Sequence, residues 1–487
     1  MDTTVFFFLI IIFYGALLFF DLFFKSCAHY PYLRLLDGLG LEIGYFNLKW
    51  STKALNRLFL KWGNIRPQFW RAWFSVGIYA SLIFLPISIC LLFYSAFVSF
   101  FRHEIATSSP VITPVIPGVN LPVAELGYYS LTLVICSVVH EAGHALAAVL
   151  YDLGVIEVGL NLYFILPVAC VRLPTEKLTA LNLKSKLSIF CAGIWHNLLL
   201  SFFGYLLYCS LPTIFSPFYY TGKGVQISDI SRHSPLKSPE GLHINDIILS
   251  INDCKVTNED DWFNCLSNRE LLLPGICIES ELVNTLDESV PLKHIGNGIV
   301  ECCDPSNKKN LCFEYTDLEN NELELPGHVC LPGRTIIEKS ANFCTIGPHV
   351  CTGNFYCFKP VLPNNTYLFK VTLKRARPVI YIGHPSDFYR TIDVSSYIKR
   401  TNLLGLNIPD ISTKLLKYIV VISLGLAFVN VLPFMYMDGE YVTKVLGLIL
   451  LKDIIGKRKS VLVATVITWL FTIFLILVLV HAAFRML

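Results

Sequence analysis

One apolar stretch of this chain contains the polar pattern H-E-x-x-H. The stretch is Leu126–Leu150, and the pattern consists of His140, Glu141 and His144. An ionisable side chain inside a bilayer costs about 2.5 to 3.5 kcal/mol on insertion scales, so such residues are functional by default. Two histidines at positions i and i+4 share one helix face and can bind one zinc ion, and the adjacent glutamate is placed to act as a base. The alternative is a set of polar residues that merely pack together, and the membrane context favours the metal site.

The composition supports a membrane protein. Hydrophobic residues make up 54% of the chain. Apolar runs near the roughly 20 residues needed to cross hydrocarbon occur at 5–24, 74–101, 126–150, 187–207, 415–434 and 460–484. The first run has neither a basic segment before it, where Asp2 is the only charge, nor a small-residue cleavage site, so we interpret it as a retained anchor. We predict a polytopic α-helical membrane protein with about six spans; a net charge of +3 gives no case for a nucleic-acid partner.

Basic residues predict the orientation of these spans. They are concentrated in residues 25–73, whereas Arg102 is the only one in residues 101–125. By the positive-inside rule the first loop is cytosolic, which places residues 221–400 in a lumen and residues 151–186 and 435–459 in the cytosol. An alternative stays open, because Pro86 could divide the second span into two half-helices and put the first loop on the other side.

Cysteines provide independent support for a lumenal region. Ten of the 16 cysteines of the chain lie in residues 221–400. An even number in a lumenal loop predicts disulfides. A second zinc site using His328-x-Cys330 and His349-x-Cys351 is the rival interpretation, but it lacks C-x2-C spacing. Asn364 begins a glycosylation sequon in the same region, which fits a lumenal face.

The same region has the strand order of a PDZ-like domain. Residues 224–230 alternate like a strand, and residues 241–252 resume strand character after a turn. The order resembles a PDZ domain, whose sheet edge accepts a peptide as an added strand. Residues 277–357 look like a mostly irregular, cysteine-rich insertion, with 367–373 and 379–382 as closing strands. The alternative is a disulfide-stapled domain without a peptide-binding role.

A third metal ligand is needed, since a catalytic zinc site has three protein ligands and an open position. The segment N-V-L-P-F-M-Y-M-D-G ends the fifth span, where Pro433 and Gly439 are expected to break the helix at the depth of Asp438. Broken backbone at membrane depth is tolerated where it lines a polar cavity. The alternative for Asp438 is a helix cap at the interface.

Together these motifs resemble the intramembrane site-2 proteases. H-E-x-x-H in one span, G-I-W-H-N in the next, a PDZ-like lumenal loop and N-x2-P-x4-D-G occur in that order. The resemblance implies that His140, His144 and Asp438 bind one Zn²⁺ per chain and that Glu141 is the general base. It also implies that Asn197 and Asn430 lie near the substrate strand or the developing oxyanion. The expected regions are N-terminal spans and a cytosolic loop (1–124), a catalytic core (125–210), the lumenal domain (221–400) and a C-terminal core (412–487).

The family resemblance also implies a substrate class. Its members cleave membrane-tethered transcription factors, such as sterol regulatory element-binding proteins, within a transmembrane segment after a first lumenal cut, and they release a cytosolic fragment. We therefore expect a multi-pass protein of the Golgi or endoplasmic reticulum whose partners are the bilayer and single-span membrane proteins already cut on the lumenal side. Residues 155–164 are rich in β-formers and resemble the family's membrane-embedded hairpin, in which an edge strand could pair with unwound substrate. The alternative is an interfacial loop.

Two other functional classes remain. A zinc-binding membrane transporter would use His140, His144 and Asp438 as ligands but would have no need of an adjacent base. An inactive scaffold is disfavoured because every catalytic residue of these motifs is present.

Overall fold

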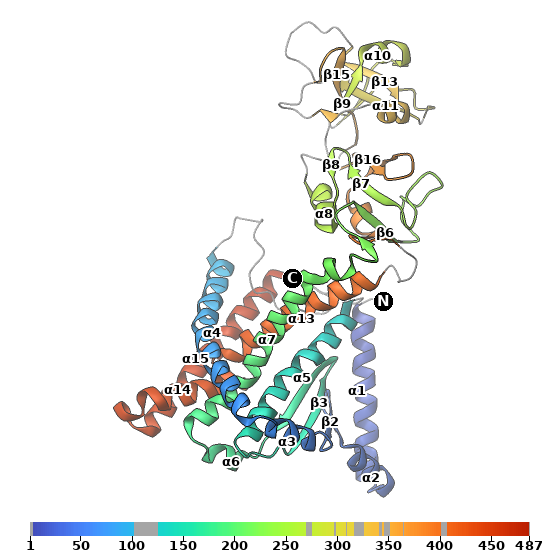
Figure 1. Cartoon of the computed structure of the whole chain (residues 1–487). Coiled ribbons are helices and arrows are strands. Elements are labelled where there is room, and N and C mark those ends of the chain that lie inside the picture. The colour runs from blue at the N-terminus through green and yellow to red at the C-terminus, as the bar shows by residue number, and fades with distance from the viewer. Residues whose placement is uncertain are drawn as a thin grey trace. The chain divides into compact units, whose positions relative to one another are not determined.

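The computed structural model describes residues 3–101, 125–268, 275–296, 299–307, 309–315, 326–339, 343–344, 351–363, 365–400 and 407–486. The chain forms two compact units (Figure 1). The first contains Met1–Cys209 and Thr413–Leu487, and the second contains Ser210–Ser412.

Among the described residues, six helices are long and apolar enough to cross a membrane, so the chain is a multi-pass membrane protein. The helices are α1 (Thr3–Ser26), α4 (Pro67–Phe101), α5 (Leu126–Leu150), α7 (Leu183–Phe215), α13 (Ile408–Val431) and α15 (Lys457–Met486). The alternative of two half-helices around Pro86 is wrong, because α4 continues through this proline over 35 residues. Proline removes one N–H, and the helix still satisfies its other backbone groups in an apolar environment.

Two loops predicted from hydropathy contain regular structure. The segment 435–459 includes α14 (Asp438–Ile455), which packs against α15. The segment 25–73 contributes α2 (Tyr30–Leu39), β1 (Leu41–Gly44), β2 (Asn47–Thr52) and α3 (Asn56–Asn64) before α4 begins. Hydropathy missed these elements because they are too short or too polar to span a bilayer.

The first unit contains a sheet built from two distant hairpins. β3 (Glu157–Tyr163) and β4 (Leu166–Arg172) follow α5, and the antiparallel order is β1-β2-β3-β4. β2 and β3 pair from Asn47↔Tyr163 to Thr52↔Val158. The prediction of strand structure in residues 155–164 is confirmed, but its interpretation as an edge strand is wrong. β3 lies inside the sheet, and the edge strand is β4, which contacts α5.

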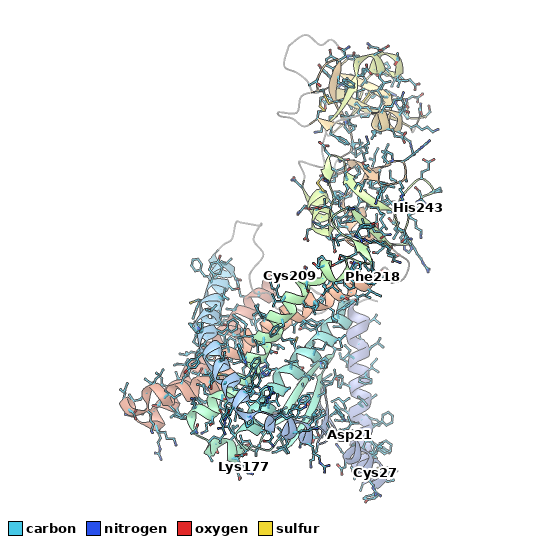
Figure 2. The ribbon with its side chains drawn as sticks, viewed as in Figure 1. Asp21, Cys27, Lys177, Cys209, Phe218 and His243 are labelled. Carbon is cyan, nitrogen blue, oxygen red and sulfur yellow. A yellow bond between two sulfur atoms is a disulfide. The ribbon has the colours of Figure 1, made fainter. Side chains whose placement is uncertain are left out.

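The first helix is fastened to this sheet by polar side chains. Tyr14 is buried and donates a hydrogen bond to Phe164 O at the turn of the β3–β4 hairpin, at 2.8 Å. Asp21, near the end of α1 (Figure 2), pairs with Lys25 at 2.8 Å and accepts from the Tyr32 hydroxyl at 2.9 Å. These partners satisfy a buried carboxylate in the first span.

The second unit contains a sheet of order β17-β16-β7-β6-β18, with β8 paired to β7. Its elements are β6 (Val225–Ile230), β7 (Ile247–Ile251), β8 (Cys254–Lys255), α8 (Glu259–Ser267), β16 (Tyr367–Leu373), β17 (Val379–Gly383), α12 (Ser386–Tyr389) and β18 (Ile392–Ser395). The predicted closing strands at 367–373 and 379–382 are confirmed. The predicted strand over 241–252 begins only at Ile247, because residues up to Asp246 form a turn in which Asn245 has a φ of 75°. A short ladder pairs β5 (Tyr219–Tyr220) with β19 (Ile398–Lys399).

The cysteine-rich insertion is more ordered than expected. It has a five-stranded sheet of order β13-β12-β15-β9-β14 and a buried core of its own. Its elements are β9 (Gly275–Glu279), α10 (Ser280–Leu286), β10 (Lys293–Gly296), β11 (Ile299–Glu301), β12 (Asn310–Tyr315), β13 (His328–Pro332), α11 (Gly333–Lys339), β14 (Phe343–Cys344) and β15 (Phe355–Pro360). The prediction of a mostly irregular insertion is wrong, because short apolar strands supply buried residues such as Phe313, Val329 and Phe358.

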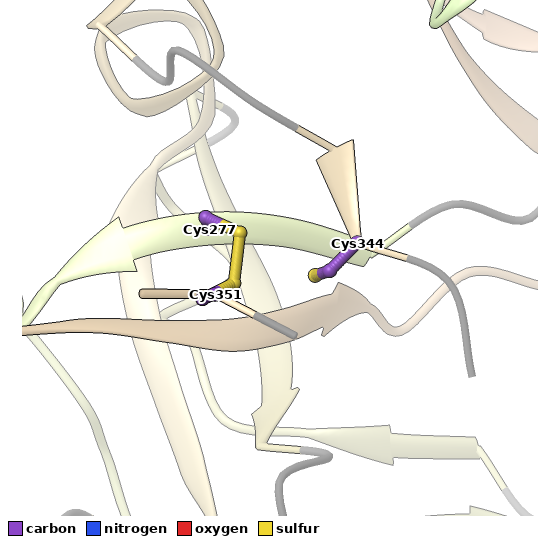
Figure 3. A group of neighbouring side chains, drawn as sticks. All are labelled: Cys277, Cys344 and Cys351. Carbon is purple, nitrogen blue, oxygen red and sulfur yellow. A yellow bond between two sulfur atoms is a disulfide. The ribbon is translucent and has the colours of Figure 1, made fainter. Parts of the chain in front are cut away.

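All ten predicted cysteines form disulfides, so the disulfide prediction is confirmed. The pairs are Cys254–Cys265, Cys277–Cys351, Cys302–Cys312, Cys303–Cys330 and Cys344–Cys357. Figure 3 shows the Cys277–Cys351 bond beside Cys344. The rival second zinc site is therefore wrong, since Cys330 and Cys351 are both cross-linked. His349 and the sequon residue Asn364 lie outside the described residues.

Candidate metal centre

Three ligand atoms from two distant motifs converge in the first unit. His140 Nε2 and His144 Nε2 on α5 are 3.1 Å apart. Asp438 Oδ2, in the first turn of α14, lies 3.0 Å from His140 Nε2 and 3.2 Å from His144 Nε2. A tetrahedral zinc site with bonds of about 2.0 to 2.1 Å has ligand atoms about 3.3 Å apart. The triangle of donor atoms therefore fits a zinc ion.

The His144 ring is held in the form that a metal requires. His144 is 8% exposed, and its Nδ1 lies 2.8 Å from Ile189 O on α7. A carbonyl oxygen can only accept, so Nδ1 carries the proton and the lone pair is on Nε2. That lone pair faces Asp438 and His140.

His140 has a side-chain partner instead of a carbonyl. Asn197 on α7 is fully buried and its amide lies 3.1 Å from His140 Nδ1. An amide can present either its nitrogen or its oxygen, and a metal on Nε2 selects the oxygen because Nδ1 must then carry the proton. The Ser423 hydroxyl on α13 donates to Asn197 O at 2.9 Å and lies 3.4 Å from the Asn197 amide. The amide nitrogen can thus donate to Ser423, and the chain from His140 to Asn197 to Ser423 has a partner at every step.

A glycine leaves the space beside the two imidazoles. A Cβ at Gly193 would lie 2.5 Å from His144 Nε2 and 2.6 Å from His140 Nε2. Carbon atoms do not approach nitrogen so closely without a clash, so any side chain at this position would occupy the room between the donor atoms. Gly193 and Asn197 are one helical turn apart on α7 and face the same site.

Asp438 is positioned by a sharp break between two helices. α13 ends at Val431, two residues before Pro433, since the residue before a proline disfavours helical geometry. α14 starts at Asp438. A Cβ at Gly439 would lie 2.0 Å from Leu432 O, so only glycine allows the start of α14 to approach the end of α13. The connecting loop is fixed by Thr472 on α15, whose hydroxyl accepts from Met435 N at 3.0 Å.

Glu141 is bound to the neighbouring sheet. Its Oε2 accepts a hydrogen bond from Val171 N on β4 at 3.0 Å. Within the described part of the chain, Oε1 has no hydrogen-bond partner. One carboxylate oxygen is therefore anchored while the other can exchange a proton.

The structure brings His140, Glu141, His144, Asp438 and Asn197 together. Asn430 donates to Leu426 O in its own helix at 3.0 Å. The expected contacts of Asn197 and Asn430 with substrate or oxyanion stay predictions. The described residues contain one other group with metal-like spacing, Cys277, Cys344 and Cys351, but these sulfurs are in disulfides.

Several residues around the site were not found from the sequence. Gly193 stands in the quoted motif one turn before Asn197, and this spacing was the signal that could have identified it. Four others contact the site from elements that are distant in the sequence: Ile189, Ser423, Thr472 and Val171. No local pattern identifies such residues.

Comparisons with known proteins agree with the motifs. The sequence model of Peptidase family M50 matches residues 128–479. The chain is also similar to a protein of Arabidopsis thaliana named "Membrane-bound transcription factor site-2 protease homolog". The two are 23% identical over 421 residues, which cover 76% of this chain and 79% of that protein.

Proposed function

Because the chain belongs to peptidase family M50, we propose that it is a zinc-dependent endopeptidase that cleaves single-span membrane proteins within the bilayer. One observation carries this proposal. His140, His144 and Asp438 present three donor atoms within 3.2 Å of one another, next to Glu141, in a unit that contains the candidate spans.

The residues around the donor atoms have separable tasks. A zinc ion bound there would act as a Lewis acid on the scissile carbonyl and on the attacking water. Glu141 Oε1 accepts the proton of the attacking water and passes it to the leaving amine, while Val171 N holds Oε2. Ile189 O and Asn197 keep the two imidazoles in the orientation of ligands. Asn430 and Asn197 are also the candidates for contact with the substrate strand or the oxyanion.

The cysteines support a lumenal location for the second unit. All ten of its cysteines are in disulfides, which persist in oxidising compartments. We place the protein in the Golgi or endoplasmic reticulum with this unit in the lumen, where Asn364 is a candidate for glycosylation. With that orientation, His140 and His144 lie in the cytosolic half of α5, and cleavage releases a cytosolic fragment.

The substrate class follows from the family and from the Arabidopsis relative, whose name refers to a membrane-bound transcription factor. We propose membrane-tethered transcription factors, such as sterol regulatory element-binding proteins, that have already been cut on the lumenal side. The sheet of β6, β7, β16, β17 and β18 is a candidate PDZ-like fold. The predicted strands at 224–230, 367–373 and 379–382 correspond to β6, β16 and β17, and they support the proposal that this sheet contacts the lumenal stub of the substrate.

A transporter is the weaker alternative. It would need the three ligands and a path, whereas the placement of Glu141 beside them serves only hydrolysis. Membership of a peptidase family favours the hydrolase.

The test is cleavage of a trimmed single-span substrate by the purified chain, with and without a zinc chelator. Glu141→Gln should keep one zinc per chain and lower the rate by about 10²- to 10⁴-fold. His140→Ala, His144→Ala and Asp438→Ala should lose both zinc and activity. Zinc occupancy of one in Asp438→Ala would remove this residue from the ligand set, and near-wild-type cleavage by Glu141→Gln would overturn the mechanism.

A further inference from the structure

The catalytic helix and the edge strand β4 share a second contact besides the one at Glu141. Ser137 precedes Glu141 by one helical turn on α5 and is 5% exposed. Its hydroxyl oxygen accepts from Ala169 N at 3.0 Å and donates to Val134 O in its own helix at 3.1 Å. The Ser137 hydroxyl therefore acts both as a donor and as an acceptor, and the bond that it accepts from Ala169 N connects the sheet to the helix.

The two contacts match in spacing. Ser137 and Glu141 are four residues apart on a helix, which is about 6 Å at 1.5 Å per residue. Ala169 and Val171 are two residues apart on a strand, which is about 6.6 Å at 3.3 Å per residue. Helix and strand can thus make both hydrogen bonds in a single register, at 3.0 Å each.

The sequence of β4 disfavours one of the two nearest alternative registers. Backbone groups of a strand alternate in direction, so Ala169 and Val171 point toward α5 and Pro167 has the same orientation. A slip by two residues would bring Ala169 N to Glu141 and Pro167 to Ser137. Proline has no N–H, so the slipped strand would lose one of its two bonds.

We propose that Ser137 is a positioning residue for the base: by holding Ala169 N, it sets the register of β4 that presents Val171 N to Glu141 Oε2. The proposal rests on the assignment of Glu141 as the base. It differs from simple satisfaction of a buried amide, because it requires that loss of the Ser137 hydroxyl change the anchoring of a carboxylate one turn away.

Hydrogen exchange tests the contact without any catalysis. In Ser137→Ala, the amides of Ala169 and Val171 should both exchange about fivefold faster, because each loses a hydrogen bond or its register. Ser137→Thr keeps the hydroxyl and should exchange like the wild type. Glu141→Gln keeps an acceptor for Val171 N and should also retain protection. Faster exchange at Ala169 alone in Ser137→Ala would show a local amide contact and overturn the positioning role.

Kinetics of the full chain on the trimmed substrate provide the second readout. Ser137→Ala should lower kcat by about 10- to 100-fold, as expected for a misplaced catalytic group, with KM and zinc content unchanged. Ser137→Thr should restore kcat. The matched control is Thr132→Val, since the Thr132 hydroxyl donates to Tyr128 O and Tyr129 O of its own helix.

Each outcome decides between the two roles. An equal loss of kcat in Thr132→Val and Ser137→Ala, or a rise in KM alone, would overturn the proposal. If the wild-type chain does not cleave the substrate at all, the proposed function fails, and the exchange measurement still decides whether Ser137 sets the position of Val171.

Discussion

The two units keep their cysteines in opposite states. All ten cysteines of the second unit are in disulfides. The six of the first unit, Cys27, Cys90, Cys136, Cys170, Cys191 and Cys209, are free. Cys209, the residue before the second unit begins at Ser210, is free, and the next cysteine in the chain, Cys254, is in a disulfide. The two halves of the same chain are thus stabilised by different means.

This difference follows from what each unit can bury. The insertion in the second unit is a small sheet with short strands, and cross-links restrict its unfolded state. The first unit consists largely of long apolar helices whose backbone groups are satisfied within each helix. In the described part of this unit, the candidate metal centre is therefore held by hydrogen bonds and packing, without disulfides. Substitutions near the centre should change metal binding, whereas loss of a disulfide should change stability in the second unit.

The largest effect is expected when one methyl group is added at Gly193 in the first unit. Gly193→Ala places a Cβ 2.5 Å from His144 Nε2 and 2.6 Å from His140 Nε2, so the donor atoms must separate. We expect loss of zinc altogether, measured by metal analysis of the purified chain, with the disulfides of the second unit intact.

Gly204→Ala is the matched control on the same helix. Its Cβ would meet only the side chains of Val420 and Ile419, at 3.2 and 3.6 Å, so zinc should be retained. Full zinc occupancy in Gly193→Ala would show that the helices yield and that the space beside the imidazoles is not required.

Removal of a disulfide should affect the second unit only. The Cys277–Cys351 bond closes a sequence separation of 74, and the Cys254–Cys265 bond closes one of 11. The chain-entropy model assigns about 4 kcal/mol to the longer loop and about 3 kcal/mol to the shorter. Replacing Cys277 and Cys351 by alanine should lower the protection of β9 in hydrogen exchange. Replacing Cys254 and Cys265 by alanine should lower the protection of β7, and this loss should be smaller. Loss of zinc in either variant would contradict the separation between the units.

Asn197 should affect metal affinity by an intermediate amount. Asn197→Leu removes the partner of His140 Nδ1, and loss of such a partner typically costs about 10- to 100-fold in metal affinity. Asn197→Asp keeps an acceptor oxygen and should bind zinc more tightly than Asn197→Leu. Competition with a chelator measures both. Equal affinity in the two variants would mean that Asn197 does not orient the ring.

Ser423 should have the smallest effect. Ser423→Ala leaves the contact between His140 and Asn197 and removes the hydroxyl that supports the Asn197 amide and donates to Asn197 O. A single hydrogen bond contributes about 1 kcal/mol, so we expect zinc affinity to fall about fivefold. A larger loss of zinc affinity than in Asn197→Leu would contradict the proposal that Ser423 acts on His140 through Asn197.

The local motifs of the metal centre were readable in the sequence because each lies within one or two helical turns. H-E-x-x-H predicts two imidazoles on one face, and the Pro433 and Gly439 break predicts an aspartate at membrane depth. The sheet was not readable in the same way. β2 and β3 are separated by more than 100 residues, and no period in residues 25–73 shows that they pair with residues 157–163.

The sequence by itself determined the spans, the cysteine-rich region and the residue types that can bind a metal, because hydropathy and helical spacing act over short distances. Only the tertiary structure decided which groups support these residues. Ile189, Asn197, Val171 and Gly193 act across helix–helix and helix–strand contacts. Their roles depend on distances of about 3 Å between elements far apart in the chain, and such distances are fixed only when the helices and the sheet pack together.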